Sequence, residues 1–80
     1  MKKGFKYVEI IIDTSEKEYL EDIIDEKLYP VQKNKRETAY RGLLPQRDLD
    51  HQITMINASP YGGAYTLKID HKIYFEGNRG

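Results

Sequence analysis

The residues best suited to acid–base or metal chemistry are two histidines, each directly preceded by an aspartate. Asp50 and His51 lie in the stretch DLDH with Asp48, and Asp70 and His71 lie in KIDH. Imidazole and carboxylate groups serve as metal ligands and general bases, so a site would form if the fold brought the two stretches together. Their spacing matches no metal motif, and such residues at turns mainly supply hydrogen bonds. We predict no metal site, no cofactor and no catalytic residues.

Other catalytic motifs are missing from the sequence. The adjacent glycines in YGGAY are not followed by the Lys-Ser/Thr of a phosphate-binding loop. Ser15 has the position of a helix cap and Ser59 precedes a proline, so neither has the context of a nucleophile elbow. The expectation is therefore a protein that is not an enzyme.

The clearest chemical feature is an excess of acidic residues in EKEYLEDIIDEKLY, residues 16–29, of which six are acidic. The chain has a formal net charge of +0, but residues 13–28 carry seven acids and two lysines, a charge of −5. Residues 29–47 carry five basic residues and one acid, a charge of +4. Acids at i,i+4 spacing repel by roughly 0.2–0.5 kcal/mol per pair in an exposed helix, so a basic group is expected opposite them.

Three interpretations of this charge layout stay open. The basic segment 33–41 folds back and neutralises the acids, or the acids form a solvated face, or they form a docking surface for a basic protein partner. In the third case, charge raises the association rate and selects the partner. The residues predicted to bind that partner are the acids of the stretch and a loop tyrosine: Glu18, Glu21, Asp22, Asp25, Glu26 and Tyr61.

The alternative prediction is a nucleic-acid-binding domain that uses the basic segment. Basic residues interleaved with an aromatic side chain are typical of surfaces that neutralise phosphates and stack on bases. Against this, the segment has no known signature, and the sequence pI of about 6.7 is far below that of most such domains. The candidate residues are Lys33, Lys35, Arg36, Tyr40 and Arg41.

The first half of the chain predicts one strand and one helix to position these residues. FKYVEIII, residues 5–12, alternates and then becomes continuously apolar, as in a central strand buried on both faces. Ser15 and Glu18 have capping-box spacing, with Thr14 as an alternative N-cap, and Pro30 forbids a helix beyond Tyr29. The helix between these limits would bury an apolar stripe of Tyr19, Leu20, Ile23, Ile24 and Leu28.

The second half predicts strands and turns. Residues 37–44 form a short strand with Gly42 as a bulge, and residues 45–50 form a turn. Residues 51–57 and 64–69 form a hairpin across a loop that contains Tyr61. At the C-terminus, residues 64–75 form either one long strand or a hairpin with a three-residue turn. Residues 76–80 form a frayed tail.

These elements predict an α+β fold in one domain, residues 1–80, with β-α-β-β-β order. A mostly antiparallel sheet would carry one amphipathic helix packed on one face. The other face would be uncovered and would suit a partner or a second copy, so a homodimer through it is a further alternative. Glu9 and Asp13 interrupt the N-terminal apolar run, which argues against a signal or membrane segment. We predict a small non-enzymatic, cytoplasmic protein-binding module of the inhibitor or adaptor type.

Overall fold

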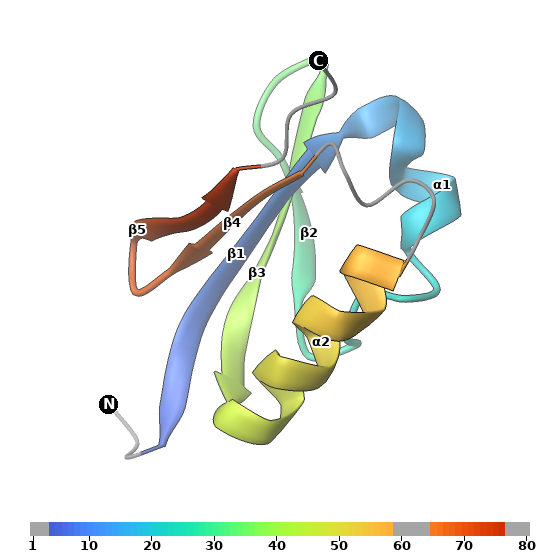
Figure 1. Ribbon diagram of the computed structural model, residues 1–80. Coiled ribbons are helices and arrows are strands. Elements are labelled where there is room, and N and C mark those ends of the chain that lie inside the picture. The colour runs from blue at the N-terminus through green and yellow to red at the C-terminus, as the bar shows by residue number, and fades with distance from the viewer. Residues whose placement is uncertain (1–3, 59–64, 77–80) are drawn as a thin grey trace.

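A five-stranded antiparallel sheet forms the centre of the molecule. The computed structural model describes residues 4–58 and 65–76 (Figure 1). The strands are β1 (Phe5–Asp13), β2 (Tyr29–Gln32), β3 (Glu37–Pro45), β4 (Tyr65–Ile69) and β5 (Lys72–Glu76), in the spatial order β2-β3-β1-β4-β5. All four neighbouring pairs are antiparallel. The predicted α+β class, antiparallel sheet and central first strand are confirmed.

The predicted element order misses edge strand β2 and is also wrong after β3, because the chain forms a helix there. Helix α2 (Gln46–Ala58) replaces the predicted turn over 45–50 and strand over 51–57, and therefore the predicted hairpin over 51–69. Leu49, Gln52 and Ile56 are buried and Ile53 is partly buried, which is one face of a helix. With a short helix after β1, the first six elements have the β-α-β-β-α-β order of the split β-α-β arrangement, to which β5 is added.

The long acidic helix is also a wrong prediction. A 3-10 turn (Thr14–Glu16) leads into α1 (Lys17–Leu20), and the helix ends at Leu20 with Glu21 as its C-cap. Neither Ser15 nor Thr14 is the cap, because the Asp13 carboxylate accepts a hydrogen bond of 2.9 Å from the backbone N–H of Ser15. A continued helix would have stacked like charges at i,i+4. Residues 21–28 instead form a connection that leads into edge strand β2.

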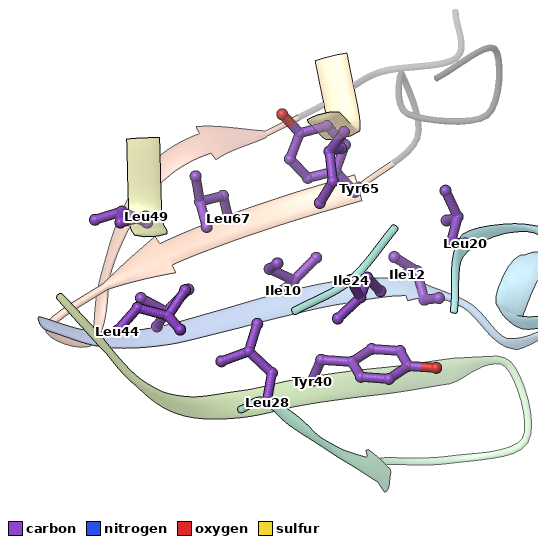
Figure 2. Close-up of a cluster of buried hydrophobic side chains, with 12 residues drawn as sticks. Ile10, Ile12, Leu20, Ile24, Leu28, Tyr40, Leu44, Leu49, Tyr65 and Leu67 are labelled. Atoms are coloured by element: carbon purple, nitrogen blue, oxygen red, sulfur yellow. The ribbon is translucent and has the colours of Figure 1, made fainter. Parts of the chain in front are cut away.

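The helices and the connection all pack on one face of the sheet. Figure 2 shows side chains from β1, β3 and β4 in one cluster with residues of the connection and α2. Alternation along each strand puts every second residue on this face. Leu20, Ile24 and Leu28 of the predicted stripe enter this core, whereas Tyr19 is 52% exposed. The cluster comprises Val8, Ile10, Ile12, Leu20, Ile24, Leu28, Tyr40, Leu44, Leu49, Ile56, Tyr65 and Leu67.

The opposite face of the sheet, here called the open face, is covered by no helix or strand that the structure describes. Its side chains follow from the strand registers, in which Glu9 pairs with Arg41 and Lys68. The adjacent register positions place Tyr29 beside Arg41 and Val31 beside Ala39. The open face is therefore made of Tyr7, Glu9, Ile11, Tyr29, Val31, Ala39, Arg41, Leu43, Thr66 and Lys68.

The end of the chain is a hairpin and not one long strand. Its turn has two residues, Asp70 and His71, both at positive φ (53° and 69°), instead of the predicted three. Asp tolerates this conformation, which suits the twist of a two-residue hairpin. The irregularity predicted at Gly42 is absent, because β3 stays in register with β1 there. The register instead shifts between Leu67 and Lys68, opposite β5.

Within the described ranges, no helix combines the length and the apolar character needed to cross a bilayer.

Candidate functional site

Acidic residues surround a hollow between the α1–β2 connection and helix α2. The hollow has a volume of about 500 Å³, and its lining includes Glu21, Asp22, Asp25 and Glu26. We call it the acidic hollow. Four of the five acids predicted to bind a protein therefore lie together, although no long helix presents them. The fifth, Glu18, is exposed on α1 and does not line the hollow.

A buried glutamine on α2 holds the connection in this shape. Gln52 is 2% exposed, and its Nε2 donates a hydrogen bond of 2.8 Å to the carbonyl of Ile23. Its Oε1 accepts a hydrogen bond from the backbone N–H of Asp25. These bonds satisfy backbone groups that a helix would have satisfied internally. Because Ile24 and Leu28 point into the core, the acids between and beside them remain at the surface.

The cation beside the acidic hollow is already engaged by other acids. Lys27 Nζ lies 3.0 Å from Asp48 Oδ2 and 3.8 Å from Asp25 Oδ1. The hydrogen bond to Asp48 and the charge of Asp25 raise the pKa of Lys27, so it stays protonated. Asp25 also accepts a hydrogen bond of 2.8 Å from the backbone N–H of Lys27. Asp25 thus has a structural role that the sequence did not reveal.

The remaining acids of the hollow have no such neutralisation. Across residues 4–58 and 65–76, no ion pair involves Glu21, Asp22 or Glu26. The basic segment does not fold back onto them, because Lys33 and Lys35 lie exposed in the turn between β2 and β3. That turn is organised by Asn34, whose Oδ1 accepts hydrogen bonds of 2.8 and 2.9 Å from the backbone N–H groups of residues 36 and 37. Intramolecular neutralisation is therefore not found in the described chain.

Helix α2 adds His51 and Met55 to the hollow; the sequence analysis considered His51 only for acid–base or metal chemistry and did not single out Met55. His51 precedes Gln52 by one residue and Met55 follows it by three, so the three side chains lie on neighbouring faces of a helix. The spacing of these residues is visible in the sequence, but the prediction of a strand over residues 51–57 does not place the three side chains together. Tyr61, the other predicted protein-binding residue, lies outside the described residues.

The candidate nucleic-acid residues do not form one surface. Lys33, Lys35 and Arg36 are exposed at the β2–β3 turn. Tyr40 is 4% exposed in the core, so its ring is not presented for stacking on a base. Arg41 lies on the open face, where its Nε donates a hydrogen bond of 2.8 Å to Glu9 Oε2. This bond raises the pKa of the Arg41 guanidinium.

The two aspartate–histidine pairs are separated in the fold. Asp50 and His51 lie on α2, whereas Asp70 and His71 form the β4–β5 turn. Asp70 Oδ1 accepts a hydrogen bond of 3.2 Å from the backbone N–H of Tyr7, and the rings of His71 and Tyr7 stack with centroids 4.8 Å apart. In the described part of the chain, no three His, Cys, Asp or Glu side chains are placed to hold a metal ion.

Comparison with protein-family models, with curated proteins and with solved structures yields no match for this chain.

Proposed function

We propose that this protein is a non-enzymatic binding module whose acidic hollow docks a basic protein partner. One observation carries the proposal: Glu21, Asp22 and Glu26 line one hollow without a salt bridge in the described chain, while the adjacent Lys27 is engaged by Asp25 and Asp48. Clustered free carboxylates produce a local negative potential that attracts a cationic surface and orients it. A lysine or arginine side chain of the partner would enter the hollow.

The walls of the hollow support this proposal. Met55 is 37% exposed, and a flexible thioether adapts to the aliphatic part of a long basic side chain. Lysine and arginine bury their methylene groups against apolar surface while their charged ends remain paired. The alternative of nucleic-acid binding is favoured by no comparable observation, since Tyr40 is buried in the core and Arg41 is paired with Glu9 on the open face.

The test is affinity capture from nuclease-treated bacterial lysate with the wild-type protein and a variant that lacks the free charges. Glu21→Gln, Asp22→Asn and Glu26→Gln are combined in that variant. We expect a basic protein to be retained by the wild type, lost from the variant, and bound more weakly as salt increases.

The matched control removes two positive charges from the turn between β2 and β3, here called the basic turn, with Lys35→Gln and Arg36→Gln. It should leave capture unchanged. Equal capture by the wild type and the acidic-hollow variant would contradict the proposal. Recovery of nucleic acid alone from untreated lysate, lost in the control variant, would transfer the function to the basic turn.

A further inference from the structure

The open face of the sheet carries a second surface whose charge is opposite to that of the acidic hollow. Leu43 is 44%, Tyr29 68% and Val31 41% exposed, although all three are large apolar side chains. Tyr7, Tyr29 and Leu43 also line a hollow of about 560 Å³, with Lys27 and Gly42 at its edge. Exposed apolar groups gathered in this way mark a protein contact surface.

Strand register arranges this surface in rows that run across the sheet. Leu43 and Tyr7 form the first row, and Tyr29, Arg41, Glu9 and Lys68 form the second. Val31 belongs to the third row, with Ala39, Ile11 and Thr66. The second row therefore places charged groups between two apolar rows.

The charged row has an excess of positive charge. Glu9 is 7% exposed and is paired with Arg41 through Nε, which leaves the two terminal guanidinium nitrogens available for an acceptor. Lys68 lies on the other side of Glu9 and forms no salt bridge within the described residues. The row contains two cations and one anion, so an approaching carboxylate would be bound and a second copy of the same row would be repelled.

We infer that the open face binds an acidic amphipathic helix of a partner protein. Rows two strand residues apart are separated by about 6.6 Å, so the outer rows are about 13 Å apart. In a helix, positions i, i+4 and i+8 are separated by about 6 Å each. An apolar residue at i enters the hollow beside Tyr29 and Leu43, a carboxylate at i+4 binds Arg41, and an apolar residue at i+8 packs on Val31.

A helix suits this face better than an extended peptide does. A strand laid on the face of a sheet would leave its own backbone N–H and C=O groups without partners, whereas a helix satisfies them internally. Nucleic acid is disfavoured because Glu9 occupies the middle of the charged row and the flanking rows are aliphatic as well as aromatic. The hollow beside Tyr29 shares Lys27 with the lining of the acidic hollow, but Arg41 and Val31 do not line the acidic hollow, so different substitutions test the two surfaces.

The test is a selection from a displayed library of helical hairpins in which positions i, i+4 and i+8 and their neighbours on one helix are randomised. The wild-type protein is the bait. We expect selected helices to carry Asp or Glu at i+4 between apolar residues at i and i+8. Replacing that acid by its amide should weaken binding about tenfold or more, as expected for a charge-assisted hydrogen bond to arginine.

Two matched tyrosine variants test whether the selected helices bind to the open face. Tyr29 and Tyr74 are 68% and 65% exposed, but Tyr74 lines a different hollow, beside α2. Tyr29→Ser should weaken selected helices by about tenfold, as for an aromatic anchor, while Tyr74→Ser leaves them unchanged. Thermal melts of both variants verify that the fold is intact.

Five results would overturn the inference. Selected helices rich in Lys or Arg, or unaffected by Tyr29→Ser, would show that they bind elsewhere, and a library without enrichment would show that the face takes no helix. A concentration-dependent dimer in sedimentation that Tyr29→Ser abolishes would assign the face to a second copy. Displacement of the helices by an oligonucleotide would assign it to nucleic acid.

Discussion

Gln52 is the residue on which the shape of the acidic hollow depends. Its side-chain amide is buried and bonds to the backbone at both Ile23 and Asp25. Removing one partner of a buried hydrogen bond leaves the other unsatisfied, which costs about 1–3 kcal/mol per group. The site therefore depends on a side chain that itself belongs to the core.

We expect Gln52→Leu to lower the free energy of unfolding by about 2–4 kcal/mol, because two backbone groups lose their partners. Urea denaturation followed by circular dichroism measures the change. Gln46→Leu is the control, since Gln46 is exposed and its side chain bonds only to Asp50 among the described residues. An equal effect of both substitutions would show that Gln52 does not hold the connection.

Two buried tyrosines provide a second comparison at the residue scale. The Tyr40 hydroxyl is buried without a hydrogen-bond partner among the described residues, whereas the Tyr65 hydroxyl donates a bond of 2.7 Å to Asn57 Oδ1. Tyr40→Phe should therefore leave the free energy of unfolding unchanged or raise it by about 1 kcal/mol. Tyr65→Phe should lower it by about 1 kcal/mol. The reverse order in urea denaturation would contradict this assignment.

The same tyrosines determine how stability responds to alkaline pH. Burial raises the pKa of Tyr40, with a smaller contribution from Glu21, and burial also raises the pKa of Tyr65. Because the unfolded chain loses these protons near the ordinary pKa of 10.0, the contribution of the two tyrosines to the free energy of unfolding is constant below that pH and falls above it. Tyr40→Phe should reduce the slope of this fall. An unchanged slope in denaturation series from pH 9 to 11 would show that Tyr40 titrates alike in both states.

At the scale of elements, strand β3 and the acidic connection approach each other closely at Gly42. A Cβ atom on Gly42 would lie 2.5 Å from the carbonyl oxygen of Lys27 and 3.0 Å from Leu28 Cδ2. The first contact is with a backbone oxygen, so a change of side-chain rotamer cannot relieve it. Gly42 therefore permits the connection to cross the sheet beside the acidic hollow.

Gly42→Ala should lower the free energy of unfolding by about 1–3 kcal/mol, since the connection must move away from β3. Urea denaturation gives the magnitude, and amide chemical shifts of residues 24–29 should change most. Unchanged stability would mean that the connection is not packed against the strand. A loss of stability without changes in the amide chemical shifts of residues 24–29 would show that the strain lies elsewhere.

At the scale of the whole molecule, a net charge of +0 conceals separate surfaces. The acidic hollow lies beside α2, on the side of the sheet that carries the helices (Figure 1), and the cationic row of Arg41 and Lys68 lies on the other side. Uncompensated like charge on one surface destabilises the free protein slightly. If the charge serves binding, removing it should improve stability while it impairs association.

The variant that combines Glu21→Gln, Asp22→Asn and Glu26→Gln should therefore raise the free energy of unfolding by up to about 1 kcal/mol at low salt. The gain should shrink at high salt, where repulsion is screened. Urea denaturation at two ionic strengths measures both. A loss of stability would mean that these acids are paired within the molecule.

The sequence by itself determined the features that depend on local pattern. The alternating and then continuous apolar run of residues 5–12 specified the central strand, because a short run rich in β-branched and aromatic residues is typical of a buried strand. The apolar spacing of Leu20, Ile24 and Leu28 identified core residues, although their backbone is not helical beyond residue 20. The acidic cluster was visible as composition, and four of its members, Glu21, Asp22, Asp25 and Glu26, line one hollow.

The tertiary structure decided what local pattern leaves ambiguous. Apolar residues at 53 and 56 fit a helix as well as an imperfect strand, and packing against β1 and β3 selected the helix. Apolar spacing and cap signals favoured a helix up to Tyr29, but Gln52, distant in sequence, bonds to the backbone of the connection at Ile23 and Asp25 in place of helical hydrogen bonds. Cross-strand register placed Arg41 against Glu9 and Tyr40 in the core. These outcomes depend on contacts between residues far apart in the chain, which no local pattern contains.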